Sequence, residues 1–213
     1  MTRPTFFQPF RRVLAAVALL ALLVPTASAQ DAIDIGTAMP LADVTLKSVD
    51  GRMLSPAGVK GDRGTVVVFW CNTCPWVKKY EERMVAIASE YQEAGFGFIV
   101  LNPNDAVANP AESYAEMQKR ARDHAYSFPY VVDEGSRFAK AYGATRTPEV
   151  FVFDATDKLV YTGTIDDSPS DPAQVEQEYL RAALNQIAAS APIEVKRTKA
   201  FGCTIKFQNE GTH

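Results

Sequence analysis

The sequence predicts an α/β protein in which helices cover both faces of one mixed sheet. Strand and helix patterns follow one another in the order hairpin, β-α-β-α and then β-β-α. Strands that alternate with helices pair in parallel through right-handed crossovers, whereas the later strand pair adds antiparallel strands. The 213 residues are 47% apolar and 22% charged, an ordinary composition for a globular domain. Together these observations predict a three-layer α/β sandwich.

The first half of the chain holds the clearest patterns. Asp50-Gly51 follows the short patterned stretch 42–47 and predicts a hairpin turn. Residues 65–70 are an unbroken β-branched and aromatic run, typical of a strand buried on both faces. From Cys74 onward the pattern is helical, and residues 97–101 predict a second buried strand. The apolar positions at helical spacing are Val77, Tyr80, Met84, Ile87 and Tyr91.

The next segment predicts two helices with a short strand between them. Asn109 before a proline is a helix-capping pattern, so we expect a helix over residues 109–125. Residues 128–133 are an extended piece, and residues 136–142 predict a short helix that Gly143 closes.

The last third predicts a strand pair, a helix and a tail. Residues 149–154 and 158–164 have strand patterns joined by a tight turn. Asp171-Pro172 predicts the start of an amphipathic helix that runs to about residue 189, with Val175 among its inward residues. Residues 193–207 alternate without a helix signal, and we expect them to pack on the domain.

Residues 1–29 predict a secretory signal peptide. Arginines without any acid precede the apolar run 13–24, and Ala27-Ser28-Ala29 matches an A-x-A cleavage site. A membrane anchor would need about 20 apolar residues. Cleavage after Ala29 leaves a domain over residues 30–192 and a tail over residues 193–213. The protein is therefore expected to be exported, and a bacterial periplasm fits such a signal.

Charge and cysteine content exclude two further classes of protein. Lys and Arg number 22 against 25 Asp and Glu, a net charge of −3, so we expect no nucleic-acid partner. Three cysteines are too few for a small disulfide scaffold. Their positions in the sequence therefore matter more than their number.

Cys71-Asn72-Thr73-Cys74-Pro75 lies where a buried strand gives way to a helix. Two cysteines three residues apart can close a small disulfide ring, and the free N–H groups of the first helical turn favour a thiolate. We expect Cys71 at the exposed mouth of the turn as the attacking thiolate. Cys74 is expected further inward as the resolving thiol, with exchange through a mixed disulfide. Pro75 is tolerated in a first turn, where its missing N–H costs nothing.

Three other roles for the pair are weighed against redox activity. A zinc site needs four ligands, and only one further Cys and the residues His124 and His213 are available. A covalent haem needs His directly after the second Cys, where Pro75 stands. A structural disulfide is the third role, although so short a loop gains little stability from closure. Redox activity is favoured, and we expect neither a metal nor a cofactor.

The residues around the pair resemble the thioredoxin-like superfamily. Phe69-Trp70-Cys71-Asn72-Thr73-Cys74-Pro75 follows a buried strand, and Thr147-Pro148 opens a later one. The chain looks most like the redoxin branch, which is related to peroxiredoxins and thiol-specific antioxidant proteins, over residues 35–189. The resemblance implies a thioredoxin-like sandwich and a partner that is a thiol or disulfide protein or a peroxide, with a membrane electron donor.

The same resemblance assigns roles to the residues that flank the pair. Pro148 is expected to be cis and to face the disulfide, the alternative being a trans proline that begins a strand. The backbone of Thr147 would then be free to pair with an extended substrate. Trp70 and Pro75 support the pair on its two sides.

The first alternative function is that of a peroxiredoxin-like thiol peroxidase with Cys74 as peroxidatic cysteine. In the Pro-x-x-x-Thr-x-x-Cys signature of peroxiredoxins, Cys71 would replace the threonine and Val67 the proline. Because two of these positions differ, disulfide chemistry is favoured. Arg146 would stabilise a thiolate or peroxide oxygen, or else be a solvated loop charge. The second alternative is a copper carrier on the same fold, but residues 142–154 hold no histidine to bind the metal.

Cys203 in the tail has two interpretations. It is either a buried small hydrophobic residue or a second resolving thiol that the tail carries back to the pair. The first is favoured, so we expect Cys203 to be reduced, partly buried and not bonded to Cys71 or Cys74. No acid lies in residues 65–70, so the sequence identifies no proton acceptor for Cys74.

Overall fold

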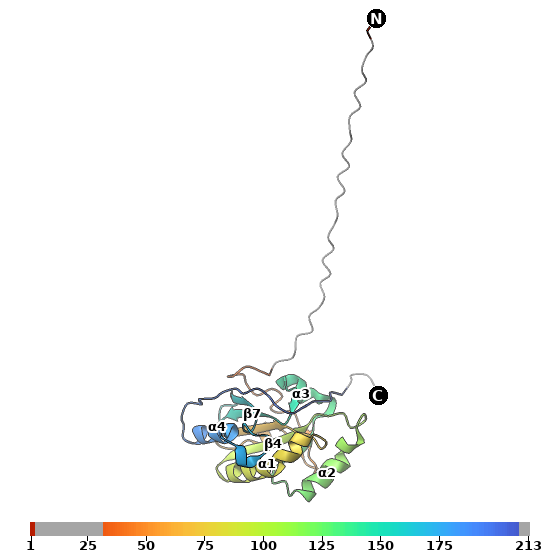
Figure 1. Ribbon diagram of the computed structural model, residues 1–213. Helices are drawn as coiled ribbons and strands as arrows, with labels where there is room; N and C mark the ends of the chain where they lie inside the picture. Colours follow the sequence, from red (N-terminus) through yellow and green to blue (C-terminus); the bar gives the residue numbers. More distant parts are fainter. Residues whose placement is uncertain (3–31, 209–213) are drawn as a thin grey trace.

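A mixed sheet of five strands forms the centre of the computed structural model, which describes residues 1–2 and 32–208 (Figure 1). Strand β7 pairs antiparallel with β3 and β8, while β4 and β5 pair in parallel. Trp70 N–H at the end of β3 donates to Leu101 O of β4 at 2.8 Å, which joins the two halves. The strands are β3 (Gly64–Phe69), β4 (Phe96–Asn102), β5 (Tyr130–Val132), β7 (Glu149–Asp154) and β8 (Leu159–Gly163).

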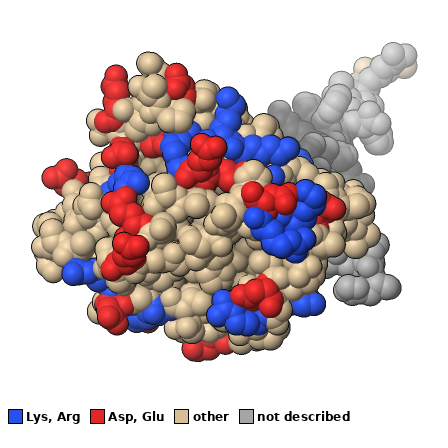
Figure 2. Space-filling model, turned by 90° about the horizontal axis from the view of Figure 1, so that it is seen from below, with Lys and Arg blue, Asp and Glu red and all other residues tan. Residues whose placement is uncertain are grey.

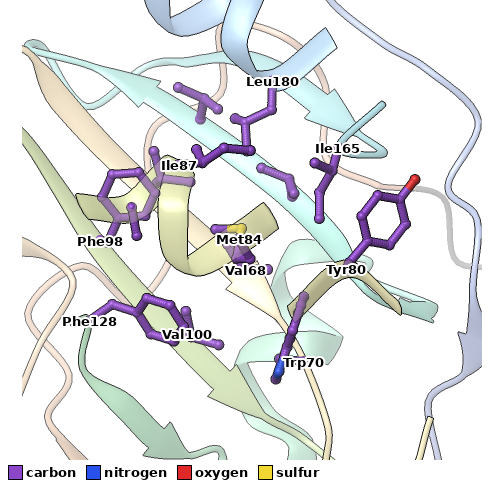
Figure 3. Close-up of a cluster of buried hydrophobic side chains, with 14 of the residues drawn as sticks. Val68, Trp70, Tyr80, Met84, Ile87, Phe98, Val100, Phe128, Ile165 and Leu180 are labelled. Atoms are coloured by element: carbon purple, nitrogen blue, oxygen red, sulfur yellow. The ribbon is translucent and has the colours of Figure 1, made fainter. Parts of the chain in front are cut away.

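Helices cover both faces of this sheet, which confirms the predicted three layers. Residues of α1, α2 and α4 share one buried cluster with one face of the sheet, and α3 packs in a second cluster on the other face (Figure 1). Figure 3 shows Met84 of α1 directly against Val68 of β3. The helices are α1 (Pro75–Glu93), α2 (Tyr114–Asp123), α3 (Arg137–Tyr142) and α4 (Tyr179–Ala188).

The predicted hairpin and strands are present, with shorter ends in places. The hairpin pairs β1 (Leu46–Lys47) with β2 (Met53–Leu54). Gly51 closes its turn at φ +87°, a conformation that costs glycine little. Strand β3 is buried along its whole length, as its sequence predicts. The predicted signal peptide over residues 1–29 lies outside the described residues except for its first two.

The helix predicted over residues 109–125 is broken into two pieces. Asn109 caps only a short 3₁₀ turn, η2 (Pro110–Glu112), by accepting from Ala111 N–H at 3.3 Å. Ser113 then adopts extended dihedral angles and precedes α2. The interruption turns the Glu112 side chain inward, where it is 2% exposed. The break therefore supplies a buried carboxylate beside the Cys71–Cys74 turn.

The helix predicted from Asp171 begins later than expected. Asp171 caps another short 3₁₀ turn, η4 (Pro172–Gln174), and Val175 is extended with ψ near 119°. Glu176 N–H donates to Asp167 Oδ1 at 3.1 Å, which ties this segment to the loop after β8. Because these side-chain partners compete with helical hydrogen bonds, α4 starts only at Tyr179.

The tail lies along the domain as far as it is described. Thr162 N–H of β8 donates to Lys196 O, and Thr198 N–H donates to Thr162 O, each at 3.0 Å. Further on, β9 (Cys203–Thr204) pairs antiparallel with β6 (Arg146–Thr147). The tail thus runs from the sheet edge at β8 to the segment before Pro148.

Charges of both signs are interspersed on the face shown in Figure 2, around a largely uncharged centre. Among the residues that the structure describes, no helix is both long and apolar enough to cross a bilayer.

Truncating Met84 tests the core beneath α1. Met84 is fully buried, so Met84→Ala leaves a cavity and should lower the free energy of unfolding by about 2–5 kcal/mol. Urea denaturation measures this loss. A cost of less than about 1 kcal/mol would mean that the core closes over the missing atoms.

Candidate redox site

The Cys71–Cys74 turn joins the end of β3 to the start of α1. Cys74 is the N-cap residue of α1, and Pro75 is its first helical residue. Backbone N–H groups at such a position have no helical partner and carry the positive end of the helix dipole. The turn therefore places the Cys74 sulfur where a negative charge is stabilised.

Both sulfurs are buried, and the expectation of an exposed Cys71 is wrong. Cys71 is 1% exposed and Cys74 2%, and both are free thiols. Thr147 covers them from the opposite side of the site. Its Oγ1 lies 3.1 Å from Cys71 Sγ, and its carbonyl oxygen lies 3.2 Å from Cys74 Sγ. The Thr147–Pro148 peptide bond is cis, as the resemblance implied.

The electrostatic environment separates the two thiols. A hydrogen bond from the Cys71 thiol lowers the pKa of Cys74, and further donors are the Cys203 thiol and the Val77 and Cys203 N–H groups. The pKa of Cys71 is raised by its hydrogen bond to Cys74, by burial and by the nearby charge of Glu112. These shifts of pKa favour ionisation of Cys74 over ionisation of Cys71.

Glu112 fixes the backbone of the turn between the two cysteines. Its Oε2 accepts from Asn72 N–H at 2.8 Å, and its Oε1 accepts from Thr73 N–H at 3.1 Å and Thr73 Oγ1 at 2.5 Å. Two amide side chains at the end of β4 also donate to this carboxylate, Asn102 at 2.9 Å and Asn104 at 3.3 Å. Five donors therefore converge on one buried anion, which makes it a positioning group for the turn.

Asn72 has a partner for each of its polar groups. Besides the bond to Glu112, its amide nitrogen donates to Ala111 O at 2.9 Å. Its carbonyl oxygen accepts from Arg120 Nη1, and its Oδ1 accepts from the Tyr130 hydroxyl, each at 3.0 Å. A buried polar residue that is fully satisfied in this way is held in one conformation.

Sequence patterns alone did not identify these bracing residues. In the sequence, Glu112 and Arg120 look like ordinary charged residues of a helix, and Tyr130 looks like an ordinary aromatic residue of a strand. What these three residues share is that each lies 39 to 58 residues away in sequence from the turn residues that it contacts. The Asn-Pro interruption before Glu112 was the one local signal, because it precedes the break that turns this carboxylate inward.

Two predicted supporting residues have structural contacts of their own. Trp70 is fully buried, and its indole N–H donates to the Tyr126 hydroxyl at 3.2 Å. Arg146 does not point at the sulfurs. Its guanidinium donates to Thr204 Oγ1 at 2.8 Å and Gly202 O at 3.5 Å, so it holds the tail in place.

Cys203 is free and partly buried, as expected, but the tail carries it to the pair. It lies opposite Thr147 in the β6–β9 ladder and packs against the buried cluster that holds Cys71 and Cys74. The pKa of Cys203 is raised by burial and by its contact with Cys74. The expectation that the Thr147 backbone is free for an extended substrate is therefore wrong, because β9 occupies that edge. Within the described part of the chain, no group of three His, Cys, Asp or Glu side chains is arranged to hold a metal ion.

The fold and the turn define a thioredoxin-like protein with a Cys-x-x-Cys pair at the start of its long helix. A thioredoxin-like protein solved in its oxidised form shares this fold with a TM-score of 0.58 at 18% identity, over 72% of this chain and 97% of that one. Residues 35–179 match the Redoxin family model, and the chain belongs to that family.

Two further relatives are similar over most of the chain. An uncharacterised conserved protein from Geobacillus kaustophilus is 37% identical, with a TM-score of 0.78 over 84% of this chain and 94% of that one. The thiol-disulfide oxidoreductase ResA of Geobacillus thermodenitrificans is 25% identical over 136 residues, which are 63% of this chain and 72% of that protein.

Neutralising Glu112 tests its role in bracing the turn. Glu112→Gln keeps the shape but turns an amide NH₂ toward groups that also donate, so it should cost about 1–3 kcal/mol of stability or more. Glu82→Gln on the exposed face of α1 is the control and should change stability by less than about 0.5 kcal/mol. Equal urea midpoints for the two variants would contradict the bracing role.

Removing the Cys71 thiol tests the origin of the Cys74 acidity. Cys71→Ala deletes the principal donor to the Cys74 sulfur, so the pKa of Cys74 should rise. The rate of Cys74 alkylation, followed against pH by peptide mapping, measures this pKa. In the unsubstituted protein its midpoint should lie below the ordinary thiol value of about 8.5. An unchanged or lower midpoint in Cys71→Ala would show that other donors stabilise the thiolate.

Proposed function

We propose that this protein is an exported thiol-disulfide oxidoreductase in which Cys74 is the attacking thiolate and Cys71 the resolving thiol. The observation that carries the proposal is the asymmetry of the pair. Cys74 caps α1, and the neighbouring Cys71 lowers its pKa, whereas the contact with Cys74, burial and the charge of Glu112 raise the pKa of Cys71. A thiolate next to a protonated second thiol suits two-step disulfide exchange.

Reduction of a substrate disulfide R–S–S–R′ takes two exchanges. The Cys74 thiolate forms a bond to one substrate sulfur, and the S–S bond breaks so that R′–S⁻ leaves and takes up a proton. Cys71 then gives up its proton and its sulfur attacks Cys74, which expels R–S⁻ and closes the Cys71–Cys74 disulfide. The substrate gains two electrons and the protein loses two. A donor dithiol reverses the protein step by the same chemistry.

The similarity to the thiol-disulfide oxidoreductase ResA and the membership of the Redoxin family support this class of reaction. The partner is a thiol or disulfide protein, and a membrane electron donor would restore the reduced pair. The signal-peptide pattern of residues 1–29 supports export to a periplasm, a compartment in which proteins form disulfides. We expect no nucleic-acid partner, because acidic residues outnumber basic ones.

Peroxide reduction at Cys74 is the second candidate, because the lowered pKa of that thiol favours it. Against it, Arg146 is engaged with the tail rather than with the sulfur. Disulfide exchange needs only the paired thiols and is therefore the function we propose.

Reduction of insulin by dithiothreitol tests the activity and the roles of the two cysteines. The unsubstituted protein should accelerate the reaction, and Cys74→Ser should return it to the uncatalysed rate because the first attack is lost. Glu82→Gln should keep full activity, and thermal unfolding checks that Cys74→Ser is folded.

Peptide mapping of the oxidised protein completes this test. It should show the Cys71–Cys74 disulfide, which reductant removes. Both thiols free under oxidising conditions would contradict the proposal. Peroxide consumption that depends on Cys74, without any acceleration of insulin reduction, would instead establish the peroxidase.

A further inference from the structure

The tail places a third thiol in the position of a substrate strand. Strand β9 pairs antiparallel with β6, with Cys203 opposite Thr147 and Thr204 opposite Arg146. Thr147 is also the residue whose carbonyl oxygen and hydroxyl lie within about 3 Å of the two active sulfurs. A peptide that adds to an open strand edge is bound by just such main-chain pairing. Here the chain itself supplies that strand.

Gly202 allows strand β9 to lie close to the backbone of Thr147. Its φ is +145°, and a Cβ added there would lie 2.1 Å from Thr147 O and 3.1 Å from Pro148 N. Any larger residue would push the strand off the segment before Pro148. Glycine therefore allows the close contact that sets Cys203 beside Cys74.

Contacts on both sides of Cys203 hold the strand in register. Before it, the Phe201 ring packs edge-on against Trp76 in the first turn of α1, with centroids 4.7 Å apart. After it, Ile205 N–H donates to Thr145 O at 3.0 Å, and Lys206 N–H donates to Asn104 Oδ1 at 2.8 Å. From this fixed position Cys203 packs against the buried cluster that holds Cys71 and Cys74, and it lies opposite the residue whose carbonyl oxygen contacts Cys74 Sγ. Cys71 reaches the same sulfur from the turn.

We propose that Cys203 is a third redox residue, which resolves a mixed disulfide on Cys74 by forming a Cys74–Cys203 disulfide. This inference rests on the proposed function, because it needs Cys74 to attack first. When Cys74 carries R–S, the Cys203 thiol loses its proton and its sulfur bonds to Cys74. The Cys74–S–R bond breaks, and R–S⁻ leaves with that proton. No further oxidant is needed, because the substrate disulfide has supplied the oxidation.

Because Cys203 is partly exposed, a disulfide that includes Cys203 can react with thiols in solution. Cys71 and Cys74 are buried, whereas Cys203 is partly exposed. An external thiolate can therefore attack the Cys203 sulfur of the Cys74–Cys203 disulfide, forming a mixed disulfide with Cys203 and expelling Cys74 as a thiolate. A thiol of low pKa is the better leaving group, and Cys74 is that thiol. Cys203 thus connects a buried pair to thiols in solution.

The test isolates Cys203 by removing Cys71. Reduced Cys71→Ser protein is treated with oxidised glutathione, quenched with acid and mapped by mass spectrometry. The expected product is the Cys74–Cys203 disulfide with two glutathione molecules released per protein. The double variant Cys71→Ser/Cys203→Ser should instead keep glutathione on Cys74, with about tenfold more adduct because nothing expels it. Equal adduct in the two proteins would overturn the proposal.

A third variant separates position from chemistry. Cys71→Ser/Gly202→Ala retains Cys203 but displaces its strand, so it should accumulate the glutathione adduct like the double variant, while thermal unfolding shows the domain intact. Efficient Cys74–Cys203 formation in this variant would overturn the role of the strand. If the wild-type protein forms the Cys71–Cys74 disulfide but the Cys71→Ser protein retains glutathione on Cys74, only the Cys203 proposal fails. If glutathione reacts with Cys74 in none of the variants, the proposed function fails and this inference fails with it.

Discussion

One buried carboxylate holds the turn on which the site depends. Glu112 accepts from Asn72 and Thr73 and, on its other side, from Asn102 and Asn104 at the end of β4. A buried anion needs several donors, and a buried turn needs acceptors for its N–H groups, so each satisfies the other. This single group joins the start of α1, the end of β4 and the 3₁₀ turn η2 that precedes α2.

The bracing of the turn has electrostatic consequences for the two thiols. The hydrogen bond to Cys74 and burial raise the pKa of Cys71, and the charge of Glu112 raises it further. Cys74 also has the first turn of α1 beside it, so burial does not prevent its ionisation. The group that fixes the backbone of the turn therefore also contributes to the difference in pKa between the two thiols.

The tail completes the site from the opposite side. Thr147 contacts both active sulfurs and pairs with the tail through its backbone. Asn104 connects the two halves of this arrangement, because its side chain donates to Glu112 and accepts from Lys206 N–H. A change in the turn and a change in the tail are thus expected to be coupled through a short chain of hydrogen bonds.

The sequence by itself determined the layers of the fold and the position of the redox pair. An apolar run such as residues 65–70 must be buried on both faces, and helical spacing after Cys74 must bury one stripe, so local pattern suffices for both. The tertiary structure alone decided that Cys71 is buried, that Glu112 turns inward, and that β9 sits beside Thr147. Each of these depends on contacts between residues far apart in the chain. The directions of the two cysteine pKa shifts have the same cause, because a pKa is set by neighbours that no local spacing reveals.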